Sequence, residues 1–139
     1  MTSTSSITVE VKVNAPLEKV WDYWTNPQHI VNWNYASEDW HAPNASNDLR
    51  VGGKFNSRME AKDGSMGFDF EGEYTRVEQH LEIEYVLADA RKVNIRFDPN
   101  GKETTVTETF DPENENTLEL QRAGWQAILD NFKRYTESN

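Results

Sequence analysis

The amino-terminal part of the chain alternates between apolar and polar residues with a period of two. The apolar positions of this stretch are Ile7, Val9, Val11 and Val13. Such alternation predicts a strand over residues 7–13 that buries one face. After Pro16 the apolar spacing becomes helical, which predicts a short amphipathic helix broken at Asn26 and Pro27, and a second short helix over 27–33.

The period of two returns five times between residues 54 and 110. The predicted strands are 54–60, 68–74, 81–87, 92–97 and 105–110. Their short connections, with turns at Asp63-Gly64 and Asn100-Gly101, predict an antiparallel meander. In that meander Glu73 and Glu84 would lie nearly opposite each other, which is unfavourable. Residues 36–48 have no period, so we predict a long loop there.

The last segment predicts a long helix from Asn116 to residue 136, with Asn116 as the cap and Glu119 three residues later as in a capping box. One strand, two short helices, the five-stranded meander and this helix make an α+β protein with a six-stranded sheet. A sheet with one solvated face curls as its twist accumulates, so a straight helix across its concave face leaves a gap. We expect residues 1–6 to be a disordered tail and 7–137 to be a single domain.

Composition and charge limit the possible partners. The chain has 139 residues, with 14 Lys and Arg against 24 Asp and Glu, and a formal net charge of -10. A field of this sign repels phosphate, so we expect neither nucleic acid nor an anionic membrane as partner. No apolar run reaches the roughly 20 residues that span a bilayer, and no secretory signal opens the chain. Without cysteine, disulfides are excluded, and we expect a cytoplasmic monomer or homodimer.

Several short motifs occur in an order typical of one family. They are Ala15-Pro16-Leu17-Glu18-Lys19-Val20-Trp21, Pro27 with Trp33, Asp48-Leu49-Arg50-Val51-Gly52-Gly53-Lys54-Phe55, Gly72-Glu73-Tyr74, Thr105-Val106-Thr107 before Phe110, and Gly124-Trp125 before Leu129 and Tyr135. Over residues 7–136 the chain resembles the domain family named for the activator of the heat-shock protein 90 ATPase. This family belongs to the START-like (SRPBCC) superfamily, so the resemblance implies a helix-grip fold: a curved sheet wrapped on a long C-terminal helix.

The resemblance leaves the activity open, because the superfamily includes lipid carriers, hormone receptors, cyclases and hydrolases. The family offers no shared catalytic set. The leading hypothesis is therefore that a small apolar or amphipathic molecule binds between the sheet and the last helix. One alternative is a cyclase- or hydrolase-type enzyme, and another is a chaperone-associated or stress-related interaction module.

Aromatic residues are frequent, at 12% of the chain, and many are on the inward-facing pattern. The predicted pocket residues are Trp21, Trp33, Tyr35, Trp40, Phe55, Ser57, Met59, Phe68, Phe70, Tyr74, Tyr85, Phe97, Glu108, Trp125 and Leu129. Tyr35 and Trp40, from the predicted loop, would close the pocket or anchor the loop.

Glu108 is the most specific candidate for a functional residue, because period two places its carboxyl inward between Val106 and Phe110. It would be a polar anchor or an acid–base group in the cavity. Alternatively, it forms a structural hydrogen bond, or a bulge at the strand end turns it outward. Ser57 would be a pocket hydroxyl or a small packing residue.

No cofactor or metal site is expected from the remaining polar residues. The three histidines, His29, His41 and His80, match no metal-binding spacing. Asp69, Glu71 and Glu73 are too far apart along one strand to hold a single cation. An enzyme is less favoured than a binding protein, since no histidine lies on the inward pattern to activate a serine.

Overall fold

The computed structural model describes residues 6–139, which form one sheet and three helices. The strands are β1 (Ile7–Val13), β2 (Trp40–Asn47), β3 (Lys54–Ala61), β4 (Gly67–Glu78), β5 (Glu82–Leu87), β6 (Lys92–Asn100) and β7 (Glu103–Phe110). The helices are α1 (Leu17–Thr25), α2 (Pro27–Ile30) and α3 (Leu118–Ser138). Of the predicted disordered tail, residues 1–5 lie outside the described residues, and Ser6 is exposed.

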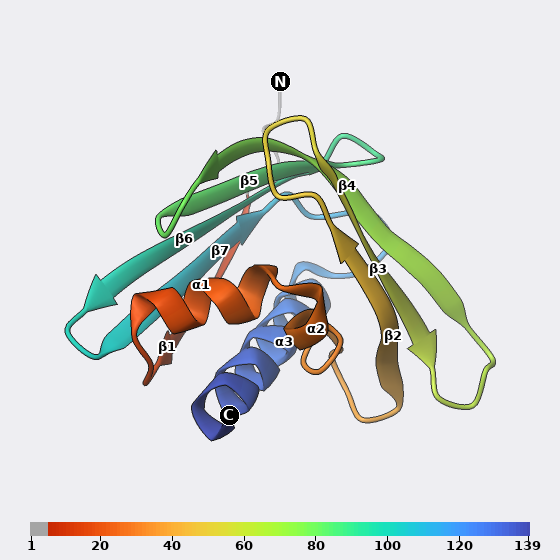
Figure 1. The fold of residues 1–139 in the computed structure, drawn as a ribbon. Helices are drawn as coiled ribbons and strands as arrows, with labels where there is room; N and C mark the ends of the chain where they lie inside the picture. The colour runs from red at the N-terminus through yellow and green to blue at the C-terminus, as the bar shows by residue number, and fades with distance from the viewer. Residues whose placement is uncertain (1–5) are drawn as a thin grey trace.

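Neighbouring strands are antiparallel, in the order β1-β7-β6-β5-β4-β3-β2. Figure 1 shows the sheet curling into a trough, with α3 in its hollow and α1 and α2 beside that helix. The two short helices carry the chain from β1 at one edge of the sheet to β2 at the other. This arrangement confirms the predicted α+β helix-grip fold and the antiparallel meander.

The sheet has seven strands rather than the predicted six, because residues 40–47 form β2 and not part of a loop. β2 is an edge strand that pairs only with β3, and Ala42 is its one buried residue. A bulge between His41 and Asn44 also interrupts its register. The apolar alternation that identifies a half-buried strand is therefore missing here, although the backbone pairing is present.

A bulge in β4 avoids the unfavourable pairing expected for two carboxylates. The register shifts between Tyr74 and Arg76, so that Arg76, and not Glu73, lies opposite Glu84. The hydroxyl of Thr75, at the bulge, donates to the Glu84 carboxylate at 3.1 Å. Opposite charges across the strands therefore replace like charges.

Helix α3 begins one residue later than predicted. Thr117 is the cap, and its hydroxyl accepts from the backbone N–H of Leu120 at 3.1 Å. Asn116 donates instead from its side chain to the Glu113 carboxylate at 3.0 Å. The predicted capping box is wrong, although Glu119 still lies in the first turn, where the helix dipole favours a carboxylate.

The two predicted hairpin turns are confirmed. Gly64 lies between β3 and β4, and Gly101 between β6 and β7. Gly101 has φ of +66° and Gly64 has φ of +77°, a region that a side chain disfavours. These residues therefore allow the tight reversals that keep consecutive strands adjacent.

Side chains along one face of α3 hydrogen-bond to the outer backbone of β1. The bonds join Arg122 to Thr8, Gln126 to Glu10, Lys133 to Lys12 and Glu137 to Asn14, at 2.7–3.4 Å. The amide of Gln126 contacts both backbone groups of Glu10, donating to the carbonyl at 3.0 Å and accepting from the N–H at 3.4 Å. The helix therefore satisfies groups that an edge strand leaves free, and it is held on the β1 side of the trough.

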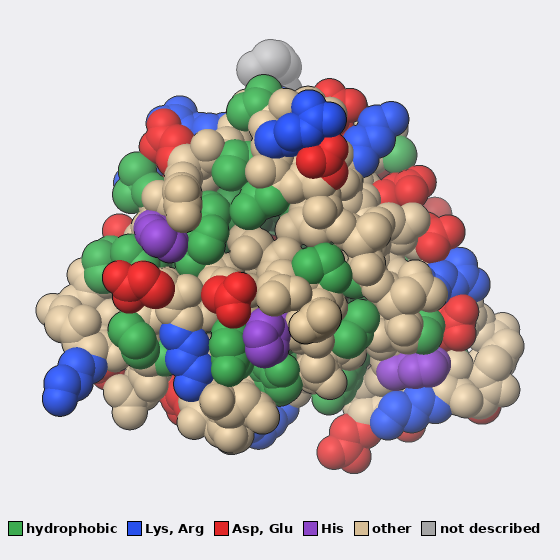
Figure 2. Space-filling view, viewed as in Figure 1, with side chains coloured by type: hydrophobic (Ala, Val, Ile, Leu, Met, Phe, Trp, Pro, Cys, Tyr) green, Lys and Arg blue, Asp and Glu red, His purple; other side chains and the backbone are tan. Residues whose placement is uncertain are grey.

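One face of the molecule carries side chains of mixed character. On the face shown in Figure 2, acidic, basic and apolar side chains intermingle. Within residues 6–139, no helix is both long enough and apolar enough to cross a membrane.

Candidate functional site: a cavity between the sheet and the last helix

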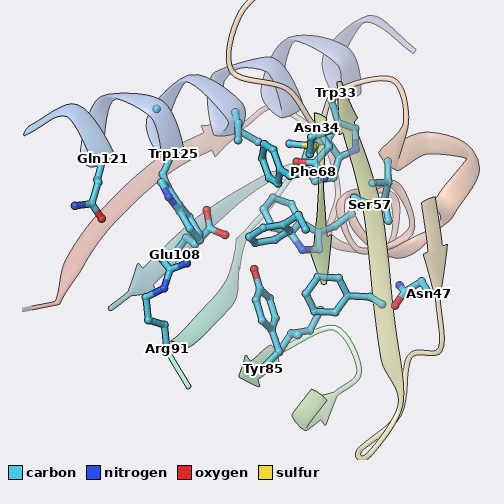
Figure 3. A pocket seen from close by; sticks show the side chains of 18 of the residues that line it. Trp33, Asn34, Asn47, Ser57, Phe68, Tyr85, Arg91, Glu108, Gln121 and Trp125 are labelled. Atoms are coloured by element: carbon cyan, nitrogen blue, oxygen red, sulfur yellow. The ribbon is translucent and has the colours of Figure 1, made fainter. Parts of the chain in front are cut away.

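A cavity of about 400 Å³ lies between the concave face of the sheet and the helices, and it opens to solvent (Figure 3). Its walls are formed by Trp24, Ile30, Trp33, Asn34, Ser46, Asn47, Phe55, Ser57, Met59, Phe68, Phe70, Tyr74, Ile83, Tyr85, Arg91, Glu108, Glu113, Asn116, Leu120, Gln121, Gly124, Trp125 and Ile128. Phe68 on β4 and Leu120 on α3 are 48% and 60% exposed, so the mouth lies between these two elements. The volume is within the range of small-molecule sites, about 300–1,000 Å³.

Three rings from neighbouring strands form the floor of the cavity. Phe55 on β3 lies edge-on to Tyr85 on β5, with ring centroids 4.6 Å apart. Phe70 on β4 lies 5.8 Å from Phe55 and 6.3 Å from Tyr85. Since alternate residues of a strand share a face, the period-two pattern brings these rings together. They form a stiff apolar surface suited to a flat ligand.

Tryptophans from the helical side face this floor. Trp125 on α3 lies edge-on to Phe70, with centroids 6.1 Å apart. At the other end, the rings of Trp24 and Trp33 are 4.8 Å apart. The indole N–H of Trp33 donates to the carbonyl of Tyr23 at 3.0 Å, so this ring is fixed in position. Rings therefore line both walls of the cavity.

Glu108 on β7 projects its carboxyl into this apolar space. The residue is only 5% exposed, and burial raises the pKa of its carboxyl to about 8. Among the described residues, no hydrogen-bond donor contacts the carboxyl, which instead faces the cavity. The carboxyl therefore keeps its proton at neutral pH and is free to contact a ligand.

The hydroxyl of Tyr85 is the second polar group of the floor. The residue is 7% exposed, and its pKa is raised well above its ordinary value, first by burial and then by the nearby Glu108. Figure 3 shows its hydroxyl pointing into the cavity from below, toward the region that Glu108 also enters. Both groups are therefore neutral at pH 7 and both point into the same space.

Three other polar residues of the wall, Tyr74, Asn47 and Gln121, already form hydrogen bonds within the protein. The Tyr74 hydroxyl donates to the Asn47 side chain at 2.5 Å, and the Asn47 amide donates to the carbonyl of Thr25 at 2.7 Å. The Gln121 amide donates to the carbonyls of Glu113 and Asn116 at 3.1 and 2.9 Å. These bonds fix β2, β4, α1 and the start of α3 around the cavity.

Gly53 tightens the connection from β2 to β3, next to Tyr74. Its carbonyl accepts from the N–H of Tyr74 at 2.9 Å, and its N–H donates to the carbonyl of Arg50 at 2.8 Å. A Cβ at residue 53 would lie 2.0 Å from the carbonyl oxygen of Asp48. Only glycine therefore fits this close approach.

Arg91 is the one basic residue among the lining residues. It lies between β5 and β6, and its guanidinium is 2.7 Å from the Asp89 carboxylate. Asp89 is exposed, but the Arg91 side chain extends toward Glu108 in Figure 3, and its positive charge partly opposes the rise in the pKa of Tyr85. Asp89 therefore balances part of the charge of Arg91, which still acts on the cavity.

The structure places ten of the predicted pocket residues along the cavity wall. They are Trp33, Phe55, Ser57, Met59, Phe68, Phe70, Tyr74, Tyr85, Glu108 and Trp125. Ser57 is buried on β3, between the rings of the wall.

The other five predicted residues do not line the cavity. Trp21, Phe97 and Leu129 are buried in the core, where Trp21 lies edge-on to Phe97 with centroids 5.1 Å apart. The Tyr35 carbonyl accepts from the Asn131 side chain at 2.6 Å, which anchors its loop to α3. Trp40 packs beside Phe68, with ring centroids 5.9 Å apart. The sequence pattern predicts which side chains face the inside of the trough. It does not predict which of them contact the open cavity and which contact other core residues.

Several wall residues were not in the predicted pocket set. Trp24 and Ile128 lie on apolar helix faces, and the helical spacing of the sequence marks both as inward-facing. Asn47 comes from the segment predicted as a loop, and Arg91 lies in a strand connection. No sequence pattern identifies these last two.

No group of three His, Cys, Asp or Glu side chains in residues 6–139 is arranged to hold a metal ion. His29 is instead 2.7 Å from the Tyr135 hydroxyl and stacks on Tyr23 at 3.8 Å. His41 lies 3.8 Å from the Glu60 carboxylate at the sheet edge.

Known proteins of similar structure share this architecture. An AHSA1-like protein from Aeromonas hydrophila, solved by NMR, is 47% identical with a TM-score of 0.90, covering 96% of this chain and 93% of that one. A protein from Cytophaga hutchinsonii is 55% identical with a TM-score of 0.83, over the same shares of the two chains. A protein from Chromobacterium violaceum, 20% identical with a TM-score of 0.86, covers 97% of this chain and 99% of that one and shares the fold alone. Among curated proteins, none matches the chain.

One family description fits most of the chain. Residues 14–137 match the family described as activator of Hsp90 ATPase homolog 1-like protein. This range includes the cavity residues of every element from α1 to α3. The chain therefore belongs to the activator of Hsp90 ATPase homolog 1-like family.

Proposed function

We propose that this protein binds a small apolar or amphipathic molecule in the cavity between the sheet and α3. The observation that carries the proposal is an open space of about 400 Å³ walled by rings from both the sheet and the helices. Rings supply a large contact area at little conformational cost, because each has few rotatable bonds. The ligand would lie against Phe55, Phe70 and Trp125, with its polar end toward Glu108.

Binding of a neutral fluorescent ring compound tests this function. N-phenyl-1-naphthylamine has no charge at neutral pH and brightens in apolar surroundings. We expect saturable brightening with the wild-type protein. In Ser57→Leu the larger side chain would enter the cavity from β3, and we expect at least about tenfold weaker binding.

Ser37→Leu is the matched control, because Ser37 is exposed and lies outside the cavity wall. It should bind the probe as the wild type does. Circular dichroism would establish that both variants fold. A folded Ser57→Leu variant with unchanged affinity, or a wild-type protein without saturable binding, would contradict the proposal.

An enzymatic role is the second candidate, and the raised pKa of Glu108, to about 8, is the observation that favours it. A general acid needs a pKa near the working pH. Glu108 nonetheless lacks a hydrogen-bonded partner in the described part of the chain that would orient it for proton transfer. Native mass spectrometry of the purified protein separates the roles: an intact co-purified molecule supports a carrier, and a chemically altered one an enzyme.

A further inference from the structure

Two unpaired hydrogen-bonding groups lie in the otherwise aromatic floor of the cavity. Glu108 and Tyr85 are both more than nine-tenths buried, and neither forms a hydrogen bond with the described residues. Buried polar groups without partners are uncommon and costly in proteins. Both groups face the open cavity, where a bound molecule can supply the hydrogen-bond partner.

The sheet geometry directs both groups to one place. Glu108 on β7 and Ile83 on β5 both lie opposite Ile95 of the intervening strand, and Tyr85 follows two residues after Ile83 on the same face. Figure 1 shows that the sheet is concave on this side, and side chains that point inward from a concave surface converge. In Figure 3 the phenol and the carboxyl both extend into the cavity. The Glu108 charge also contributes to the raised pKa of Tyr85, which agrees with this proximity.

We propose that Tyr85 and Glu108 act as two hydrogen-bond donors to one acceptor oxygen of the ligand, a carbonyl oxygen attached to an apolar ring system. This inference rests on the proposed function of the cavity. A phenol and a protonated carboxylic acid in an apolar site are known to share a carbonyl or enolate oxygen in this way. A hydrocarbon in the same place would leave both donors buried without partners, so the site selects against it.

Few other charged or titratable groups face this pair. Those that line the cavity are Tyr74 on β4, Arg91 between β5 and β6, and Glu113 before α3. Tyr74 donates to Asn47, Arg91 pairs with Asp89, and Glu113 bonds to Asn116. From α3, the side chains that face the cavity are uncharged. Glu108 therefore controls the donor capacity of the site as its carboxyl titrates.

A matched pair of ligands tests the donor site. 2-Acetylnaphthalene and 2-ethylnaphthalene share a ring system and differ in a carbonyl against a methylene. Their affinities can be compared by competition with N-phenyl-1-naphthylamine. We expect the ketone to bind about tenfold more tightly than the hydrocarbon at pH 6. At pH 10 the Glu108 carboxylate no longer donates, and the preference should fall to about threefold or less.

Variants assign this preference to the two residues. Glu108→Leu and Tyr85→Phe should each reduce the preference at pH 6. Glu108→Gln should keep a preference but lose its pH dependence, because an amide donates at every pH. Glu38→Gln, an exposed site away from the cavity, should behave as the wild type.

The outcomes separate this inference from the proposed function. If both naphthalenes bind equally at every pH, the donor pair is wrong and the cavity function remains. If a naphthylmethylammonium ion binds more tightly than the ketone and gains affinity as pH rises, Glu108 is a cation partner and the inference is overturned. If no ring compound binds, the proposed function itself fails.

Discussion

The indole of Trp125 stacks face to face on the ring of Phe110, with centroids 3.8 Å apart and planes 11° from parallel. Phe110 is on β7, two residues from Glu108 on the same face of the strand. The stack therefore fixes α3 to the sheet directly beside the buried carboxyl. It also sets the height of the cavity, because Trp125 is one of its walls.

Removing this ring should weaken both the fold and the site. We expect Trp125→Leu to lower the free energy of unfolding by about 2 kcal/mol, through lost stacking and lost apolar contact. Urea denaturation would measure the change, and probe binding should weaken in the same variant. Leu118→Ala, at an exposed position of the same helix, should change stability by less than about 0.5 kcal/mol. Equal effects of the two substitutions would contradict the role of the stack.

The buried Glu108 should make the protein less stable as pH rises. The pKa of its carboxyl is about 8 in the folded protein, against 4.5 for a glutamate in water. Below pH 4.5 the folded and unfolded states are both protonated, and between these values only the folded state keeps the proton. The free energy of unfolding should therefore fall between pH 4.5 and 8, by about 5 kcal/mol from this group.

Glu108→Gln isolates this contribution from the other titrating groups. The difference in unfolding free energy between the variant and the wild type should grow in favour of the variant from pH 5 to pH 9. Urea denaturation at both pH values measures it, with Glu38→Gln as the exposed control. A difference that stays constant with pH would show that Glu108 is not buried as a neutral acid.

The hydrogen bond between Tyr74 and Asn47 should stabilise the wall of the cavity. Tyr74→Phe leaves the half-buried Asn47 oxygen without its donor, and we expect a loss of about 1–2 kcal/mol. Thermal and urea unfolding would measure this. Tyr35→Phe is the control, because the hydrogen bond from Asn131 to Tyr35 uses the backbone carbonyl and not the phenol. Equal stability of the two variants would contradict the prediction.

Two glycine-to-alanine substitutions should have opposite effects. Gly53→Ala places a Cβ 2.0 Å from the Asp48 carbonyl oxygen, and we expect a loss of about 3 kcal/mol or more. Gly124→Ala meets nothing within 4 Å in the middle of α3, and we expect a gain of about 0.5–1 kcal/mol. The urea concentration at the unfolding midpoint should be lower for Gly53→Ala and higher for Gly124→Ala than for the wild type. A stable Gly53→Ala variant would mean that the β2–β3 connection can open without cost.

Alternation and helical spacing predicted the elements that bury a face. Glu108 is the clearest case, since its position between Val106 and Phe110 predicted an inward carboxyl, and the structure places it there. β2 could not be predicted in the same way, because an edge strand with one buried residue is defined by its backbone pairing with β3.

The sequence pattern could not predict how far the cavity extends. Phe97 faces inward as Phe55 does, yet Trp21 of α1 packs against it and fills that end of the trough. Whether an inward ring meets another element or open space depends on where the helices lie across the sheet. That placement comes from long-range contacts such as those of Gln126 with Glu10.

The hydrogen bonds from α3 to β1 also bear on how copies of this chain can meet. A foreign strand could extend the sheet only by pairing with unoccupied backbone groups at an edge. Along β1, Arg122, Gln126, Lys133 and Glu137 already occupy such groups. At the opposite edge, Pro43 has no N–H to offer and sits within the bulge of β2. Edge-to-edge pairing of one molecule's sheet with that of another, which is a route to fibrous aggregates, is therefore obstructed at both edges of the sheet.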